Sequence, residues 1–220
     1  MSRVCPLKSP FSHPWFLFIN NSFGIQTSTM RKVILFMHVS LDGFVCGPND
    51  EMDWTTMNDD KIGEFLIPDL QRTVDTMLVG RVLYQGFEQF WPTVPENPKS
   101  RPELVEFAHW MADTPKVVFS NTLKEVKWKN SSLAKADPAT TVHQMKKEPG
   151  GDMVIFGGAS LAAHFAKNNL IDEYRIKLEP VVLGKGKSLY KDITDRVKLK
   201  LIKSKSFDSG VTGLYYEVVK

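Results

Sequence analysis

The sequence predicts an α/β domain with a mostly parallel central sheet and an antiparallel hairpin at its C-terminal edge. Apolar runs of strand length alternate along the chain with segments whose apolar residues recur at helical spacing. Two of these runs end in glycine directly before a helical segment, as βα connections do. The last two strand-like segments, 197–206 and 212–219, follow each other without a helix, which predicts an antiparallel pair.

The elements follow in order from residue 33. The predicted strands are 33–39, 76–80, 116–120, a short one near 125–128, 152–156, 171–179, 197–206 and 212–219. The predicted helices are 59–73 (interrupted at Pro68), 82–90, 103–112, 140–147 and 159–168. In segment 197–206 the alternation places Leu199 and Leu201 toward the core, and its change of phase at Leu201-Ile202 predicts a β-bulge.

The composition is that of an ordinary globular protein and argues against some classes of binding partner. The 220 residues are 42% hydrophobic and 24% charged, and a net charge of +3 gives no reason to expect nucleic acid or a membrane surface as a partner. Two cysteines, Cys5 and Cys46, do not make a disulfide framework, so we expect a reducing cytoplasm. The five histidines show no metal-ligand spacing, and we predict no metal site.

The first 29 residues differ from the rest of the chain. No acidic residue precedes Asp42, and the apolar run 15–19 is too short for a secretory signal. We expect residues 1–29 to be a disordered extension and residues 30–220 to form the domain.

Two strand–glycine–helix junctions predict phosphate binding. The strand 153–156 ends at Gly157-Gly158, where a helix opens, and the strand 76–79 ends at Gly80, which Arg81 follows. Free backbone N–H groups and the positive end of the helix dipole hold phosphate at such junctions, and an arginine can add two parallel hydrogen bonds. A nucleotide with separated phosphate groups is therefore expected, although neither junction is the G-x-G-x-x-G fingerprint.

Five short motifs carry a family resemblance. In order they are Val-Ser-Leu-Asp-Gly at 39–43, Leu-Val-Gly-Arg at 78–81, Val-Val-Phe-Ser at 117–120, Val-Ile-Phe-Gly-Gly at 154–158 and Pro-Val-Val-Leu-Gly at 180–184. From residue 30 to 220 the chain resembles the dihydrofolate-reductase-like superfamily, and most closely the reductase domain of the riboflavin-biosynthesis deaminase/reductase and its stand-alone relatives. The resemblance implies the three-layer dihydrofolate-reductase-like fold.

The resemblance also implies a cofactor and its contacts. The cofactor would be reduced nicotinamide adenine dinucleotide phosphate (NADPH). Gly80 and Arg81 would hold its adenosine end, with Arg81 on the 2′-phosphate, and Ser120 and Asn121 would lie beside that phosphate. The diphosphate would lie on five consecutive residues: Gly157, Gly158, Ala159, Ser160 and Leu161.

At two places the chain departs from these relatives. Val82 and Leu83 stand where a threonine commonly caps the helix and touches phosphate. Phe156 stands where riboflavin-pathway reductases usually carry a glutamate, so the substrate is expected to differ from the riboflavin-pathway sugar.

The candidate catalytic and substrate-binding residues lie on or near the segment 40–54, which resembles the loop that covers the nicotinamide. Asp42 either orients the loop or the substrate, or satisfies N–H groups in its own turn. Asp59, five residues after Trp54, has the spacing of the pterin-binding carboxylate of dihydrofolate reductases, but is also suited to cap the next helix. Val45, Trp54 and Phe156 are the predicted substrate contacts.

The expected function is hydride transfer from NADPH to a small heterocyclic, ribosylamine-type or carbonyl-type substrate, like that of the riboflavin-biosynthesis reductase. Two alternatives stay open: a dihydrofolate reductase, supported by Trp54 and Asp59, and a noncatalytic nucleotide-binding or sensor protein that keeps the fold. The resemblance further implies a homodimer.

Overall fold

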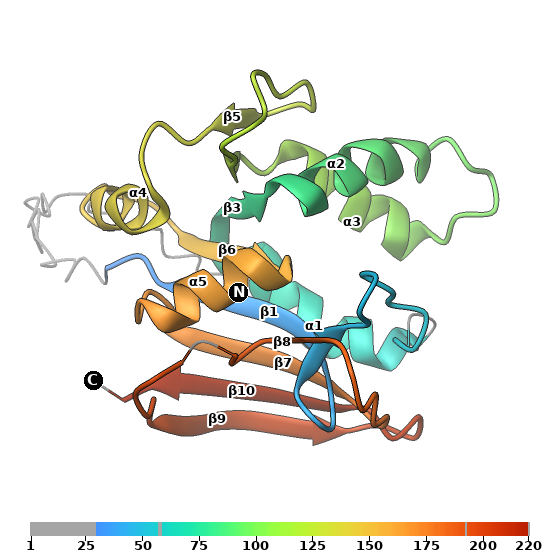
Figure 1. Ribbon diagram of the computed structural model, residues 1–220. Helices are drawn as coiled ribbons and strands as arrows, with labels where there is room; N and C mark the ends of the chain where they lie inside the picture. Colours follow the sequence, from blue (N-terminus) through green and yellow to red (C-terminus); the bar gives the residue numbers. More distant parts are fainter. Residues whose placement is uncertain (1–29, 57–58, 192, 220) are drawn as a thin grey trace, which may run out of the picture.

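An eight-stranded sheet in the order β5-β4-β3-β6-β1-β7-β10-β9 forms the centre of the protein (Figure 1). The computed structural model describes residues 30–56, 59–191 and 193–219. The strands of this sheet are β1 (Val33–Ser40), β3 (Val74–Gly80), β4 (Lys116–Phe119), β5 (Ser131–Leu133), β6 (Asp152–Phe156), β7 (Glu173–Glu179), β9 (Leu199–Ser206) and β10 (Thr212–Val218). A small second sheet pairs β2 (Phe44–Cys46) with β8 (Lys187–Ser188).

The predicted sheet topology is confirmed. The pairs from β5 through β4, β3, β6 and β1 to β7 are all parallel, and β10 is antiparallel to both β7 and β9. The helices are α1 (Asp60–Thr73), α2 (Arg81–Phe90), α3 (Pro102–Asp113), α4 (Pro138–Met145) and α5 (Ala159–Lys167), with a 3₁₀ turn η1 (Trp91–Thr93) after α2.

Helices cover both faces of the sheet, so the fold has three layers (Figure 1). On one face the buried side chains of α1, α2 and α3, such as Leu66, Tyr84 and Met111, pack in one cluster with Ile34 and Phe36 of β1. On the opposite face α4 and α5 pack against the odd-numbered residues of β1. The central strands are therefore apolar on both sides, as expected for a parallel sheet between two helical layers.

The predicted short strand near 125–128 is wrong, and the structure gives the reason. The backbone N–H groups of Lys127 and Trp128 both donate to the hydroxyl of Tyr84 at 2.9 Å, so they do not join a strand ladder. The strand that pairs with β4 comes slightly later, at β5. A hydroxyl from α2, more than forty residues away, thus takes the place of sheet pairing in this segment.

The predicted interruption at Pro68 is also wrong, because α1 runs unbroken from Asp60 to Thr73. Its apolar residues Ile62, Leu66 and Leu70 are buried along one face, while Pro68 is exposed. Burial of that face outweighs the single backbone hydrogen bond that proline removes from the helix.

The β-bulge predicted at Leu201-Ile202 is confirmed. Tyr215 pairs with Lys203 and Tyr216 pairs with Leu201, so Ile202 is the extra residue. The prediction that Leu199 and Leu201 face the core is wrong, since they are 40% and 49% exposed. β9 is the edge strand, and no helix covers these two side chains.

Candidate active site

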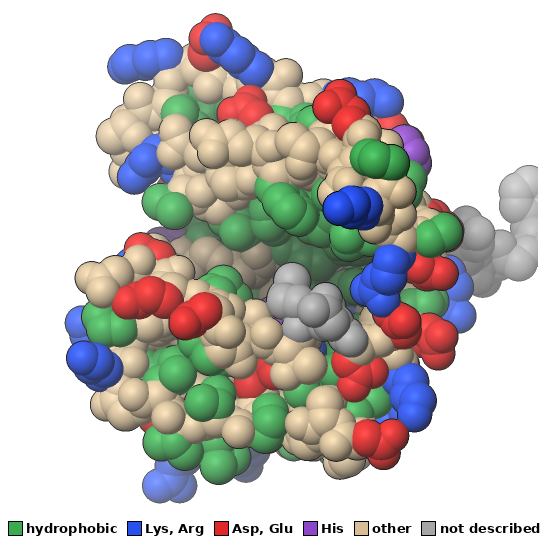
Figure 2. Space-filling view, turned by 90° about the vertical axis from the view of Figure 1, so that its right-hand side faces the viewer, with side chains coloured by type: hydrophobic (Ala, Val, Ile, Leu, Met, Phe, Trp, Pro, Cys, Tyr) green, Lys and Arg blue, Asp and Glu red, His purple; other side chains and the backbone are tan. Residues whose placement is uncertain are grey.

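The carboxyl ends of the parallel strands meet at one edge of the sheet, and the predicted cofactor residues lie there. Gly80 at the end of β3 pairs with Phe119 at the end of β4, and β6 lies on the other side of β3. Figure 2 looks at this edge and shows a hollow lined by hydrophobic side chains, with α2 and α3 above it. Ligands of open α/β sheets bind in crevices at this edge.

At the end of β6 the chain turns into α5 through two left-handed glycines. Gly157 has φ +77° and Gly158 has φ +79°, values that residues with a side chain rarely adopt. No side chain caps the helix, and its first turn holds no acidic residue. The N–H groups of Ala159, Ser160 and Leu161 have no acceptor within the helix, as in any first helical turn. They are suited to hold an anion.

A second uncapped helix start lies next to the first. Gly80 is the N-cap residue of α2, again without a capping side chain or a first-turn acid. A Cβ placed on Gly80 would lie 3.6 Å from the Cβ of Leu161, so the two helix starts are in contact range. The other α-helices are different: α1 and α3 carry Asp60 and Glu103 in the first turn, and Asp137 caps α4.

Arg81 is the first residue of α2 and is exposed. Its Nη1 donates to Oε1 of Gln85 at 3.1 Å, and no described carboxylate pairs with it. Ser120 follows Phe119, which pairs with Gly80, so Ser120 and Arg81 lie at the same end of the sheet. A cation at a helix N-terminus is unfavourable unless an anion offsets it. The position of Arg81 therefore suits a bound phosphate.

Of the predicted polar contacts to the phosphate, Ser120 already forms hydrogen bonds within the protein and Asn121 is exposed. The Ser120 hydroxyl accepts hydrogen bonds from the N–H groups of Thr122 and Leu123, so it already shapes the turn after β4. Asn121 is exposed in this turn. Leu83 lies against the glycine pair, with its Cδ2 3.9 Å from a Cβ placed on Gly157.

Val45 and Cys46 lie away from the open part of the site. Val45 is 3% exposed and belongs to the core on the α5 face, and Cys46 is buried as well. Burial, with the nearby Asp50 carboxylate, raises the pKa of the Cys46 thiol to about 11, which keeps it protonated. Their burial leaves little of either side chain exposed, and a substrate contact of Val45 stays a prediction.

Asp42 fastens the loop after β1 to the loop after β7. Its carboxylate accepts from the Ser40 hydroxyl at 2.6 Å and from the N–H groups of Leu183 and Gly184 at 3.1 and 2.7 Å. These hydrogen bonds, the one from Ser40 above all, lower its pKa to about 2. Asp42 is therefore ionised at neutral pH and positions two loops at the edge of the site.

We expect the amide resonances of Leu183 and Gly184 to report the lowered pKa of Asp42. A lowered carboxyl pKa means that the loop contact persists above 3.8 and is lost only as the pH falls toward about 2. In an NMR pH titration the two amides should hold their neutral-pH positions down to about pH 3 in wild type, while in Asp42→Asn they should be shifted at every pH. A transition centred at the ordinary value of 3.8 would contradict this.

Asp59 and Trp54 do not form the arrangement that their spacing suggested. Asp59 is the N-cap residue of α1, but its side chain makes no capping hydrogen bond and instead accepts from the Ser209 hydroxyl at 2.9 Å. The Trp54 indole donates to the Glu51 carbonyl. The Asp59 carboxylate thus faces the turn between β9 and β10.

Phe156, the residue before the glycine pair, belongs to an aromatic wall. Its ring contacts Phe36 at 5.5 Å between centroids, and Trp110 and Phe107 of α3 at 5.9 and 6.2 Å. Phe156 is only half-buried, so part of its ring remains accessible. On the β1 side the wall continues to His38, whose ring lies edge-on to Phe36 at 6.2 Å.

A buried ionic cluster beside this wall was missed by the sequence interpretation. Glu179, at the end of β7, is fully buried and accepts from His38 Nδ1 at 3.0 Å and pairs with Lys177 at 3.1 Å. Burial would raise the pKa of Glu179, but the hydrogen bond from His38 and the charge of Lys177 hold it below its usual value. Both backbone groups of Thr56 also bind this pair, its N–H to Glu179 and its carbonyl to Lys177.

The signal for this cluster was present in the sequence. The strand Glu-Tyr-Arg-Ile-Lys-Leu-Glu at 173–179 alternates charged and apolar residues, which is typical of a strand with one face in solvent. In the structure this strand is inside the sheet and the charged face lies in the protein, with exposures of 5%, 6%, 4% and 0% for its four charged residues. Buried charges in such number require partners.

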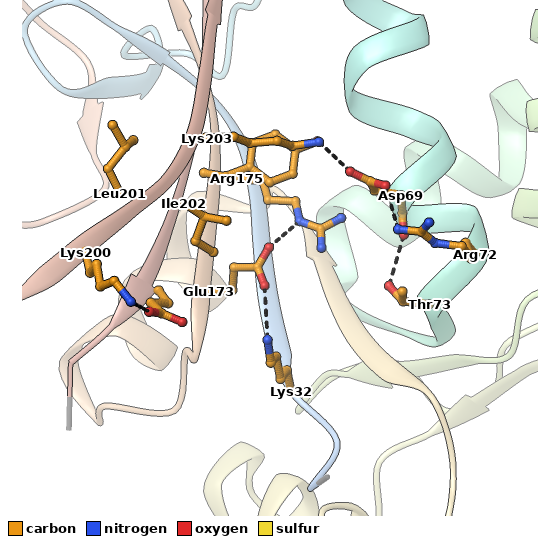
Figure 3. A pocket seen from close by; sticks show the side chains of 12 residues that line it. Lys32, Asp69, Arg72, Thr73, Glu173, Arg175, Lys200, Leu201, Ile202 and Lys203 are labelled. Carbon is orange, nitrogen blue, oxygen red and sulfur yellow. Dashed lines mark hydrogen bonds and ion pairs between the residues drawn. The ribbon is translucent and has the colours of Figure 1, made fainter.

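The first half of this charged row lies among other ion pairs. Figure 3 shows a cavity of about 550 Å³ between β7, β9, β10 and the end of α1, in which Arg175 pairs with Glu173 at 2.6 Å. Lys203 reaches Asp69 across the same cavity, and Lys200 pairs with Glu217. Here each of these cations has a carboxylate. The second half, at Lys177 and Glu179, lies instead at the carboxyl end of the sheet.

In the part of the chain that the structure describes, no cluster of three or more His, Cys, Asp or Glu side chains is placed to hold a metal ion. The described helices are also too short or too polar to span a bilayer.

Comparison with known proteins identifies the family. The RibD C-terminal domain matches residues 31–212. The chain is 37% identical to the uncharacterized protein YyaP of Bacillus subtilis (strain 168) over 84% of this chain and 94% of that protein. It is 29% identical to the uncharacterized protein YwjB of the same organism, over 82% and 95% of the two chains.

Solved structures agree on the fold. A putative riboflavin biosynthesis protein from Shewanella sp. PV-4 superposes with a TM-score of 0.64 at 24% identity, covering 86% of this chain and 99% of that one. Dihydrofolate reductase from Enterococcus faecalis, complexed with NADP(H) and RAB-propyl, superposes with a TM-score of 0.54 at 13% identity over 86% and 97%. The fold is dihydrofolate-reductase-like, and the chain belongs to the RibD C-terminal domain family.

Proposed function

We propose that this protein is an NADPH-dependent reductase that transfers hydride to a small heterocyclic or carbonyl-type substrate. The observation that carries the proposal is the pair of adjoining helix starts at α2 and α5, both without caps and without first-turn acids, with Arg81 beside one of them. This arrangement supports binding of a nucleotide with two separate phosphate groups.

The residues present fit this cofactor. The N–H groups of Ala159, Ser160 and Leu161 would hold the diphosphate, and the left-handed Gly157-Gly158 turn leaves room beside them. Arg81, with Asn121 and the turn built on Ser120, would hold the 2′-phosphate. The cofactor supplies the hydride when bound, and the chain's own task is to place an acceptor against it and to exclude water.

The substrate side of the site favours a flat ring. Phe156 adds an accessible aromatic face where a carboxylate would meet a sugar hydroxyl in riboflavin-pathway reductases. Aromatic rings attract conjugated heterocycles by stacking and edge contacts. Dihydrofolate reduction is the weaker alternative, because the Asp59 carboxylate is engaged with Ser209.

A noncatalytic sensor is the alternative from another class. The apolar Val82 and Leu83 at the start of α2 favour it, since they offer no hydroxyl to a phosphate. Hydride transfer from bound NADPH to any acceptor would exclude the sensor.

Replacing Arg81 by alanine is expected to weaken NADPH binding by ~1–3 kcal/mol and to leave NADH binding unchanged, because only NADPH carries the 2′-phosphate. Fluorescence titration with both cofactors measures this, and Arg196→Ala, an exposed arginine before β9, is the matched control. Failure of wild type to bind either cofactor would overturn the proposed function.

We also propose a homodimer, from the family resemblance, and a reducing cytoplasm, from the two cysteines. Phe107 and Trp110 of α3 are half-buried and pack against Phe156, so no more than part of each ring is open to a partner. Light scattering would decide, because a mass near one 25.0 kDa chain would contradict the dimer.

A further inference from the structure

His38 stands where the aromatic wall meets the buried ionic cluster. Its side chain is 20% exposed, while its partner Glu179 is completely buried. The Nδ1 atom is engaged by Glu179 at 3.0 Å, and no described residue forms a hydrogen bond with Nε2. A histidine held through one nitrogen with the other available is the arrangement of an oriented acid or base.

We propose that His38 is the proton donor of the reduction and that Glu179, paired with Lys177, is its positioning residue. The inference rests on the proposed reductase function. Its substrate class is a flat conjugated carbonyl or imine that lies against Phe156 and presents its oxygen or nitrogen to His38 Nε2.

The chemistry balances with the hydride donor already named. The substrate carbon accepts hydride from the reduced nicotinamide, the π bond of the C=O or C=N group breaks, and its electron pair moves to the oxygen or nitrogen. That atom takes the Nε2 proton of the imidazolium. The imidazole becomes neutral and keeps its Nδ1–H on Glu179, and water supplies the next proton to Nε2.

The ionised neighbours of His38 support this role. Glu179 is a carboxylate, held so by hydrogen bonds from His38 and the Thr56 N–H and by the charge of Lys177. A buried carboxylate that accepts a hydrogen bond from Nδ1 fixes which nitrogen of the ring faces the substrate. Lys177 offsets part of the carboxylate charge, and its ammonium is bound to Glu179 and to the Thr56 carbonyl.

The other acids considered for the site are less suited to donate a proton. Asp42 is ionised and bound to the loop after β7. The Asp59 carboxylate is directed to Ser209, and Cys46 is buried with a raised pKa. His38 alone among these four combines an accessible ring with a fixed orientation.

The test compares wild type with His38→Gln and His38→Ala, using NADPH with 4-nitrobenzaldehyde as the carbonyl probe and 7,8-dihydrofolate as the imine probe. We expect His38→Gln to lower kcat by about 100-fold or more with little change in KM or in NADPH affinity, the size usual for general acids. Added imidazole should restore part of the activity of His38→Ala. His143→Gln, an exposed histidine on α4, is the matched control.

Each outcome decides the question. A kcat of His38→Gln within about threefold of wild type, far less than loss of a general acid causes, would overturn the proton-donor role while leaving the reductase intact. If wild type does not bind NADPH, the proposed function itself is overturned.

If wild type binds NADPH but reduces neither probe, NMR of ¹⁵N-labelled histidine decides. The inference requires that neutral His38 carries its proton on Nδ1 and that Nε2 shifts when 4-nitrobenzaldehyde is added with NADP⁺. The opposite tautomer, or an unmoved Nε2 resonance, would overturn it.

Discussion

Replacing Glu179 by glutamine is expected to lower the free energy of unfolding by about 3–5 kcal/mol, because it leaves the buried Lys177 ammonium without its countercharge. Lys177 is 4% exposed and pairs with Glu179 at 3.1 Å. The matched control is Glu217→Gln, whose partner Lys200 has a side chain that is 71% exposed, and whose loss should cost much less than that of Glu179 because solvent screens the pair. Urea denaturation followed by circular dichroism measures both.

A double variant separates the lost ion pair from general damage to the site. Glu179→Leu combined with Lys177→Met removes both charges, and it should be more stable than Glu179→Gln alone because no unpaired charge stays buried. A double variant less stable than the single one would show that the hydrogen bonds to Thr56 and His38, and not the charge pair, carry the stability.

At low pH, Glu179→Gln should cost the protein less stability than it does at neutral pH. The pKa of Glu179 is lowered from 4.5, so its contribution is fully present above that pH and is lost as the pH falls through the lower, folded value. The stability difference between wild type and Glu179→Gln should therefore shrink in acid. A difference that stays constant or grows would contradict an ionised Glu179.

Removing the hydroxyl of Tyr84 is the second large expected effect. Tyr84→Phe should cost about 1–3 kcal/mol, because the buried N–H of Trp128 would lose its acceptor and an unsatisfied buried donor costs about that much. The exposed Lys127 N–H keeps a second acceptor, the Glu88 carboxylate at 3.3 Å. Tyr84 is 1% exposed and its hydroxyl also donates to Glu88 at 2.9 Å.

Thermal or urea unfolding measures this loss, and Tyr190→Phe is the control because Tyr190 is 43% exposed. We also expect amide hydrogen exchange at Lys127 and Trp128 to accelerate in Tyr84→Phe but not in Tyr190→Phe. Unchanged exchange at both amides would show that the hydroxyl does not hold this segment.

Local sequence signals predicted the elements and junctions that depend on neighbouring residues. The glycine that ends β3 and the glycines that follow β6 indicated where α2 and α5 begin. The change of alternation at Ile202 indicated the bulge. Both signals depend on only a few consecutive residues, which determine the backbone conformation and the direction of the side chains. Charged and apolar residues alternate just as regularly in 173–179. Whether both faces of β7 are buried, however, depends on α1 and on the neighbouring strands, which lie elsewhere in the chain.

The missed features all depend on contacts between distant residues. His38 and Glu179 are 141 positions apart, and the parallel pairing of β1 with β7 brings them together. Tyr84 reaches Trp128 across 44 positions, which decided the conformation of a segment that looked like a strand. Asp59 had the expected spacing from Trp54, but spacing along the chain did not determine which way its carboxylate points.

The extra residue at Ile202 affects how this protein behaves at high concentration. A regular outer strand offers a row of unpaired N–H and C=O groups on which another chain can align and begin aggregation. On β9 the bulge breaks that row beside exposed Leu199, Leu201 and Ile202, and Lys200, Lys203 and Lys205 place positive charge along it. The bulge and the lysines therefore both act against edge-to-edge pairing along this apolar stretch.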